Sequence, residues 1–332
     1  MKYPFSARSY QNLHNRSKMP VFPSYVLITP ARNEAQFIEG TIESVIAQTL
    51  RPLKWVIVSD GSVDGTDDIV QKYVKSHPWI ELLRMPERAE RHFAGKVFAF
   101  NAGYERIQSL APEIVGNLDA DVTFVPDHFE FLIGKASEDP SLGVFGAPFR
   151  EGDFQYDYRF TNIENVWGGC QLFRRECYAD IGGYKPVKGG CIDHIAVVGA
   201  RMHGWKTRTF TERVCIHHRV MGTAQQGPIK SKFRMGAKDY SVGNHPMWEL
   251  FRAVYQTRNR PLIIGGMAMA AGYFWSSLRR AEVRVTPEMV RFIRYEQMNR
   301  LRRLLGLRQT QGTAFADLKS TKQASDLGRS AS

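Results

Sequence analysis

The stretch NLDADVTF at residues 117–124 places two carboxylates, Asp119 and Asp121, two positions apart, shortly after the apolar residues Ile114 and Val115. Side chains two apart on a strand point to the same face, so on a strand both could approach one ion. Two like charges this close repel each other unless a cation lies between them. A hard cation such as Mg²⁺ or Mn²⁺ binds oxygen ligands of this kind together with substrate phosphates. The pair therefore predicts a divalent-metal site, although such a pair is expected roughly once by chance in a chain of this length.

The segments that precede and contain this pair alternate between strand and helix patterns. Four short apolar runs are typical of buried strands: YVLITP from residue 25, KWVIVSDG from 54, IELLRM from 80 and EIVGNLDAD from 113. Apolar residues recur at helical spacing between them, at 37–50, 62–74 and 95–107. Strands that alternate with helices predict right-handed crossovers and a mostly parallel sheet with helices on both faces. We find no internal repeat.

Polar residues follow three of these predicted strands. They are Arg32, Asn33 and Glu34 after the first strand, Asp60 and Asp64 after the second, and the aspartate pair after the fourth. In parallel sheets, ligands bind outside the carboxyl ends of the strands. A single polar strand end is commonplace, but three at one sheet edge predict a binding site.

Composition narrows the class of protein. The chain of 332 residues is 43% hydrophobic and 12% aromatic, which is typical of a folded globular protein. Its net charge of +12 favours an anionic partner, which charge alone leaves open between nucleic acid, acidic lipid and a phosphorylated substrate. Four cysteines without CxxC spacing argue against a zinc site and favour reduced, buried thiols in a cytosolic protein. The first 20 residues contain no apolar run that would predict a signal peptide.

The C-terminal third differs from the rest. Residues 261–278 are almost wholly apolar but short for a membrane span of about 20 residues. An arginine-rich segment follows, in which Val290, Ile293, Leu301, Leu304 and Leu305 gather on one helical face. A short span, a hairpin in one leaflet and a buried helix all stay open. The positive-inside tendency favours a segment on the inner leaflet, followed by a basic amphipathic helix that binds acidic lipid.

The motifs of the first two thirds resemble the family 2 glycosyltransferases of the GT-A fold. They are TPARNE at 29–34, VSDGSVDGT at 58–66, GKVFAFNAG at 95–103, DAD at 119–121, GGCQLFRRECYADIGGY at 168–184 and DHIAVVGARMHGW at 193–205. The resemblance covers about residues 25–220, and the set in this order is far more specific than any one motif. It implies a GT-A catalytic domain at 21–225. Composition and patterning predict the rest: a flexible arm at 1–20, a helical, membrane-associating extension at 226–308 and a disordered tail at 309–332.

The resemblance also implies how a nucleotide sugar is held. Asp60 would accept a hydrogen bond from the base, unless it only forms the turn before Gly61. Pro30, Ala31, Arg32 and Glu34 would line the base and ribose, and Lys96 would meet the diphosphate. Asp119 would serve the ribose and Asp121 a Mg²⁺ or Mn²⁺ ion bound to both phosphates. His217 or His218 would be a further metal ligand, with His217 preferred.

Catalysis in the family uses an aspartate as base, preceded by a second acid. This chain has Ile192, Asp193 and His194 at that place, so Asp193 is the predicted base and the first acid is missing. A helix N-cap is the alternative role for Asp193. Trp167, Gly168 and Gly169 match the segment that shapes the sugar and acceptor pockets, where Trp167 either stacks on a sugar or packs in the core.

The expected activity is therefore inverting transfer of a sugar from a UDP-sugar, or a GDP-sugar, to a glycan or lipid-linked acceptor. Such an enzyme of surface polysaccharide or lipid-linked glycan synthesis would be cytoplasmic, at the inner face of the cell membrane, and would bind no nucleic acid. Two alternatives stay open: a nucleotidyltransferase of similar fold, which releases pyrophosphate, and a basic nucleic-acid-binding protein. A third is a family member that has lost catalysis.

Overall fold

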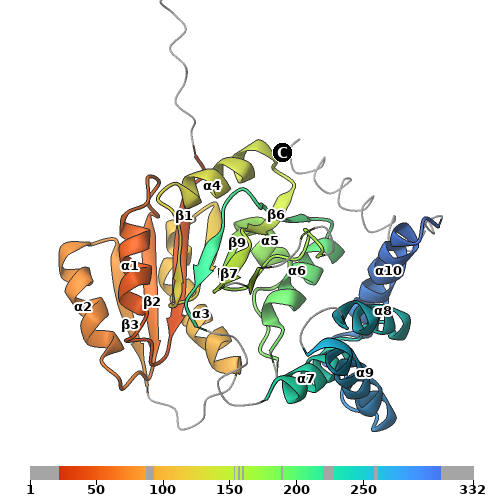
Figure 1. The fold of residues 1–332 in the computed structure, drawn as a ribbon. Helices are drawn as coiled ribbons and strands as arrows, with labels where there is room; N and C mark the ends of the chain where they lie inside the picture. Colours follow the sequence, from red (N-terminus) through yellow and green to blue (C-terminus); the bar gives the residue numbers. More distant parts are fainter. Residues whose placement is uncertain are drawn as a thin grey trace, which may run out of the picture.

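The computed structural model describes residues 22–86, 93–152, 154–155, 158, 161–187, 190–219, 227–257 and 261–307. The predicted arm at 1–20 and the predicted tail at 309–332 lie outside the described residues. Within the described part, an α/β body is followed by four consecutive helices (Figure 1).

A seven-stranded sheet forms the centre of the body, in the order β10–β6–β9–β4–β1–β2–β3. The strands are β1 (Tyr25–Ala31), β2 (Lys54–Asp60), β3 (Ile80–Met85), β4 (Ile114–Leu118), β6 (Leu142–Gly146), β9 (Cys170–Arg174) and β10 (Lys206–Thr209). Neighbours run parallel except at β9, which is antiparallel to both β4 and β6. The prediction of a mostly parallel sheet is confirmed.

Helices cover both faces of this sheet, as predicted. They are α1 (Ile38–Ile46), α2 (Thr66–Ser76), α3 (Phe93–Ile107) with the short 3₁₀ helix η1 (Gln108–Leu110), α4 (His128–Glu138), α5 (Arg175–Asp180) and α6 (Ile192–Met202). Successive residues of β1 enter different cores, because side chains of a strand alternate between faces. Leu27 packs with α1, α2 and α4, whereas Val26 and Ile28 pack with α3, α5 and α6.

A second, four-stranded sheet joins segments that are far apart in the sequence. Its order is β5 (Val122–Thr123), β11 (Cys215–His217), β7 (Phe149–Glu151) and β8 (Phe154–Gln155). His217 pairs with Val122, the residue that follows the aspartate pair. This sheet therefore places β11, the last strand of the body, next to the turn that follows β4.

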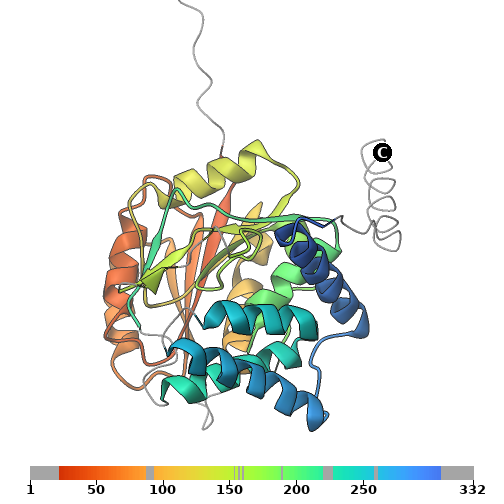
Figure 2. The same cartoon turned by 45° about the vertical axis from the view of Figure 1, so that its right-hand side comes forward.

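The four C-terminal helices are α7 (Pro228–Ser241), α8 (Pro246–Gln256), α9 (Leu262–Leu278) and α10 (Pro287–Leu304), which gather on one side of the body (Figure 2). Helices α7 and α9 meet backbone to backbone. A Cβ added to Gly236 would lie 1.8 Å from the carbonyl oxygen of Met269, and one on Gly272 would lie 1.9 Å from that of Phe233. Among the helices of the described ranges, none has the length and hydropathy needed to cross a bilayer.

Helix α10 packs part of its predicted apolar face against the body. Ile293 and Leu301 of the predicted apolar face are buried, and Ile293 packs with Val198 of α6. Arg201 of α6 also binds Glu296 through two hydrogen bonds of 2.7 and 2.8 Å. Leu304 and Leu305 of the same stripe are exposed, so the body covers only part of it.

Candidate functional site

The loops after β1 and β2 are fastened to each other by short polar side chains. The amide of Val63 donates to Oδ1 of Asn33 over 2.9 Å, and the amide of Ala35 donates to Oδ2 of Asp64 over 3.0 Å. Asn33 adopts the left-handed conformation (φ 56°), in which asparagine is enriched among non-glycine residues. The two predicted polar clusters thus form one rigid rim at the carboxyl ends of these strands.

Asp60 and Arg32 face each other across this rim. The carboxylate oxygen Oδ2 of Asp60 lies 4.0 Å from Nη1 of Arg32, and Asp60 is only 5% exposed. Asp60 ends β2, and β1 separates β2 from β4, so the ends of β2 and β4 lie roughly 10 Å apart. Pro30 and Ala31 end the intervening strand β1. The predicted positions of the nucleotide base, at Asp60, and of the diphosphate, beyond β4, are therefore separated by strand β1.

Asp119 and Asp121 are not on a strand, which corrects the sequence prediction. Strand β4 ends at Leu118 and β5 begins at Val122, so both acids occupy the connecting turn. The turn is fixed by backbone bonds from Asp119 N–H to the carbonyl of Gly169 (2.8 Å) and from His218 N–H to the carbonyl of Asp121 (3.0 Å). Strand alternation is therefore not the reason why the two carboxylates share a site.

Lys96 of α3 pairs with the first acid of the aspartate pair. Its Nζ donates to Oδ1 of Asp119 over 2.5 Å. Burial would lower the pKa of Lys96, but the charges of Asp119, Asp193 and Asp121 outweigh burial and raise it. The repulsion within the aspartate pair is therefore offset in part by a cation of the protein itself.

Asp121 has further cationic partners. Its Oδ2 lies 3.5 Å from Nε2 of His217 and 3.3 Å from Nε of Arg219, whose guanidinium also binds Glu34. Burial would raise the pKa of Asp121, but His217 and Arg219 outweigh it and lower the pKa. Glu34, predicted to line the nucleotide, is thus tied to the acid pair through Arg219.

His217 is oriented by a carboxylate on the neighbouring strand. Its Nδ1 lies 2.9 Å from Oε2 of Glu151, while Nε2 points to Asp121. Burial would lower the pKa of His217, but Asp121 and Glu151 raise it. Metal-binding histidines usually have a carboxylate on the ring nitrogen that does not face the ion. Asp121 and His217 therefore fit a Mg²⁺ or Mn²⁺ ion by donor type and by this supporting contact.

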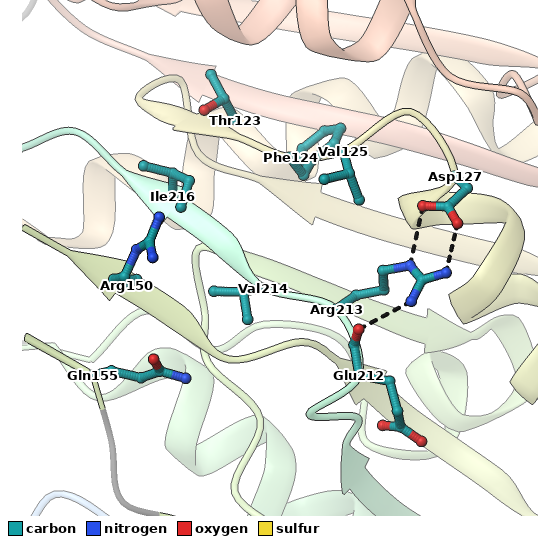
Figure 3. Close-up of a pocket in the computed structure, with 10 residues that line it drawn as sticks. All are labelled: Thr123, Phe124, Val125, Asp127, Arg150, Gln155, Glu212, Arg213, Val214 and Ile216. Atoms are coloured by element: carbon teal, nitrogen blue, oxygen red, sulfur yellow. Dashed lines mark hydrogen bonds and ion pairs between the residues drawn. The ribbon is translucent and has the colours of Figure 1, made fainter.

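His218 points away from the acid pair. Its Nε2 lies 2.8 Å from Oγ1 of Thr123. Thr123 and Ile216 line a pocket of about 660 Å³ on this other face of the small sheet, where Asp127 pairs with Arg213 over 2.5 and 3.0 Å (Figure 3). The pocket is therefore separate from the carboxylate cluster around Lys96.

Asp193 lies in the first turn of α6 and is not its N-cap. The N-cap is Cys191, which has a positive φ of 69° and makes no capping bond through its side chain. The side chain of Asp193 packs on Gly168, where an added Cβ would come within 2.5 Å of the Asp193 Cβ and 2.7 Å of its Oδ2. Ile192, which replaces the expected acid, is 7% exposed and belongs to the core on this face.

Asn117 connects the glycine segment to the acid pair. Its Nδ2 donates to the carbonyl of Gly168 over 2.6 Å and reaches Oδ1 of Asp119 at 3.4 Å. A Cβ on Gly169 would lie 2.2 Å from the ring of Trp167. That ring packs on Phe149 with centroids 4.5 Å apart. Trp167 is therefore held by core contacts, which leave less of its ring for a sugar.

Three residues of this site were not predicted. Glu151 follows no motif and gave no signal in the sequence. Arg219 directly follows the predicted histidine pair, and Asn117 begins the NLDAD stretch, so adjacency could have suggested both. Their roles depend on contacts between β4, β7 and β11 that residue spacing does not reveal.

Three buried residues form a second group of potential metal ligands. The thiols of Cys170 and Cys215 each lie 3.7 Å from Nε2 of His128, and all three side chains are fully buried. Within the described ranges, Nδ1 of His128 has no hydrogen-bond partner. A metal-bound histidine normally donates from that nitrogen, so the group lacks the supporting contact that His217 has.

Comparison with known proteins places the chain among glycosyltransferases by sequence. The family model described as "Glycosyl transferase family 2" matches residues 26–197. TuaG of Bacillus subtilis (strain 168), a glycosyltransferase assigned to teichuronic acid biosynthesis, is 34% identical over 108 residues, which cover 32% of this chain and 40% of TuaG. The poly-β-1,6-N-acetyl-D-glucosamine synthase of Staphylococcus aureus (strain COL) is 31% identical over 117 residues, 35% of this chain and 26% of that protein. The chain thus spans well under half the length of these relatives.

The fold is shared with a solved glycosyltransferase. The mannosyltransferase PcManGT of Pyrobaculum calidifontis, determined in complex with GDP-mannose and Mn²⁺, aligns over 92% of this chain and 81% of its own. The TM-score is 0.52 and the sequence identity is 20%.

Proposed function

The chain belongs to glycosyl transferase family 2, and from that premise we propose that it transfers a sugar from a nucleoside-diphosphate sugar to an acceptor hydroxyl, with inversion at the anomeric carbon. The nucleotide would lie across the carboxyl ends of β2, β1 and β4. Asp60 would accept a hydrogen bond from the base, which leaves UDP and GDP open, with UDP preferred. Lys96 would meet the diphosphate at the other end.

A divalent cation, Mg²⁺ or Mn²⁺, would be held by Asp121 and His217. When bound, it would neutralise the charge that develops on the departing diphosphate. His217 suits this role because Glu151 holds Nδ1 and Nε2 faces Asp121, so that once Nε2 gives up its proton both residues could bind one cation. The complex of PcManGT with GDP-mannose and Mn²⁺ supports the same type of donor and metal.

Asp193 would act as general base. It would take the proton of the acceptor hydroxyl as that oxygen bonds to the anomeric carbon. The bond from this carbon to the diphosphate oxygen breaks, and its electron pair leaves with the nucleoside diphosphate. Base and leaving group on opposite sides of the sugar give inversion. Lys96 would help to hold the donor side, because its ammonium pairs with Asp119 over 2.5 Å.

The acceptor would be a growing glycan or a lipid-linked glycan of surface polysaccharide synthesis. The names of the two bacterial relatives support this class, since one is assigned to teichuronic acid biosynthesis and the other is a poly-N-acetylglucosamine synthase. Gly168 would leave room for the Asp193 carboxylate beside the acceptor, because an added Cβ would lie 2.7 Å from its Oδ2.

The observation that carries this proposal is a chain of contacts: Lys96 pairs with Asp119 over 2.5 Å, Asn117 links Asp119 to Gly168, and Asp193 packs on Gly168. The test is product release from a panel of nucleotide sugars with Mn²⁺ or Mg²⁺. Release of a nucleoside diphosphate that stops on addition of a chelator is the expected result. Release of pyrophosphate would instead indicate a nucleotidyltransferase, and turnover unaffected by chelator would remove the metal from the proposal.

A further inference from the structure

Helix α9 buries three glycines together with Met269, Tyr273 and Ser276, and exposes most of its other large apolar residues. Its buried residues include Gly265, Gly266 and Gly272, and the helix contains no charged residue. The exposed side comprises Ile263, Ile264, Met267, Ala271, Phe274, Trp275 and Leu278, which we call the α9 face. At 100° per residue these positions fall within about a third of the helix circumference. A surface helix whose outer side faces water usually has polar residues there and its large apolar side chains in the core.

The glycines explain why the large residues cannot turn inward. An added Cβ on Gly266 would lie 2.3 Å from the carbonyl of Ala253 on α8, and one on Gly272 would lie 1.9 Å from that of Phe233 on α7. Close approach through small residues is how helices associate where lipid covers their outer side. The apolar pocket between α7 and α9, lined by Ile229, Phe233 and Ala268, extends the apolar surface toward α7.

The charges of these helices favour an anionic surface. The only carboxylates of α7, α8 and α9 are Asp239, which pairs with Arg252 over 2.6 Å, and Glu249, which is fully buried. Basic side chains lie beside the α9 face. Lys230 lines the adjoining pocket, and the guanidinium of Arg279 lies 4.4 Å from the ring centre of Trp275. An aromatic ring with a neighbouring arginine is typical of side chains at a membrane–water interface.

We propose that the α9 face docks on a bilayer surface that contains anionic lipid, with the helix lying in the plane of the interface. Its 17 residues, about 25 Å of helix, lie along the surface and do not span it. A second copy of this chain is the poorer partner, because a two-fold interface would bring the same basic edges together. The partner is therefore lipid, and the docking element is α9 and not the arginine-rich α10.

Helix α7, which packs against α9, also carries a charge that acts on the start of α6. Burial raises the pKa of Cys191 to about 11, and the ammonium of Lys238 on α7, in hydrogen-bond contact with the thiol, opposes that rise. Cys191 is the N-cap of α6, two residues before Asp193. If the proposed transfer reaction holds, docking would bring the predicted base toward an acceptor that is anchored in the same bilayer.

Flotation of the purified full-length protein with vesicles tests this docking without donor or acceptor. The vesicles are phosphatidylcholine alone, or phosphatidylcholine mixed with phosphatidylglycerol, at low and high salt. We expect flotation with the anionic vesicles at low salt, and a loss of about tenfold or more in the double variant Met267→Glu/Phe274→Glu. Leu110→Glu is the matched control, since this leucine is 49% exposed on η1 of the body.

Two flotation results would overturn the proposed docking on lipid. Wild type that stays unbound to anionic vesicles at low salt, or a double variant that floats like wild type, would overturn it. Light scattering without vesicles covers the remaining alternative: a dimer that Met267→Glu/Phe274→Glu disperses would identify a second copy as the partner and would also overturn it. Thermal unfolding of every variant confirms that it is folded. Because no substrate is present, failure here is separate from failure of the transfer reaction.

Discussion

The imidazole of His217 and the carboxylate of Glu151 lie 2.9 Å apart on neighbouring strands, Nδ1 to Oε2. This contact fixes which ring nitrogen faces Asp121 before any ligand arrives. A carboxylate behind a histidine also raises the basicity of the nitrogen that meets a metal. The pair therefore makes the proposed metal site testable through a residue that does not touch the metal itself.

Substitution of Glu151 by glutamine should weaken Mn²⁺ binding by about 10- to 100-fold, because the amide orients the ring less well and adds no negative charge. Titration calorimetry with Mn²⁺ and nucleoside diphosphate measures the change. Glu212→Gln, at an exposed glutamate of the pocket on the other side of the small sheet, is the control and should bind as wild type. Equal affinity in both variants would argue against His217 as a ligand.

Replacement of Gly168 by alanine should reduce turnover and leave nucleotide affinity nearly unchanged. The new methyl group would lie 2.5 Å from the Cβ of Asp193 and must push that side chain aside. A misplacement of about 1 Å at a reacting group can cost roughly 100-fold in rate. Steady-state kinetics and nucleotide titration separate the two effects. Gly40→Ala is the control, since its added Cβ would meet only an ordinary contact at 3.7 Å. Normal turnover by Gly168→Ala would mean that Gly168 does not position Asp193 for catalysis.

Substitution of Lys96 by methionine should lower nucleoside-diphosphate affinity by about tenfold or more, because a charge-assisted hydrogen bond to phosphate is lost. The variant also leaves Asp119 without its 2.5 Å partner, so repulsion with Asp121 adds to the loss. Lys72→Met on the exposed side of α2 is the matched control. Fluorescence titration with UDP and GDP measures both variants, and unchanged affinity in Lys96→Met would remove Lys96 from the donor site.

Glu249 should make the protein less stable as the pH rises. Burial, together with the charge of Asp239, raises the pKa of this carboxyl to about 8, although Arg252 opposes the rise. The folded chain then holds a proton that the unfolded chain releases near pH 4.5, so this contribution to stability falls between about pH 4.5 and 8. Glu249→Gln should gain on the order of 3 kcal/mol relative to wild type between pH 5.5 and 8.5.

Urea unfolding at those two pH values measures the gain. Glu105→Gln, at an exposed glutamate of α3, should show no such pH-dependent advantage. A difference between Glu249→Gln and wild type that is the same at both pH values would mean that Glu249 is charged in the folded chain.

Much of the fold follows from the sequence, because apolar runs and helical spacing are local properties. The runs beginning at residues 25, 54, 80 and 113 form parallel strands β1 to β4, as predicted. The antiparallel strand β9 could not be foreseen, since strand direction depends on the path of the whole chain. The packing of Ile293 of α10 against α6 was not predicted for a related reason: an amphipathic pattern shows which side is apolar but not whether protein or lipid covers it.

The sequence predicted the acidic residues of the candidate site but not the residues that hold them in place. Asp119 and Asp121 share a turn and not a strand, and Asn117 links Asp119 to Gly168, on which Asp193 packs, while their roles in donor binding and catalysis stay predictions. Glu151 and Arg219 belong to contacts between distant segments, which no spacing encodes. Cys170, Cys215 and His128 make the same point, because their proximity arises only in the folded chain.

In the proposed reaction, Asp193 removes the acceptor proton while Asp60, Lys96 and the pair Asp119 and Asp121 hold the donor. The most direct test compares wild type with Asp193→Asn for both donor affinity and nucleoside-diphosphate release, using whichever nucleotide sugar wild type turns over. We predict a loss of about 100- to 10,000-fold in release with donor affinity within about twofold of wild type. Release by Asp193→Asn at the wild-type rate would contradict the account.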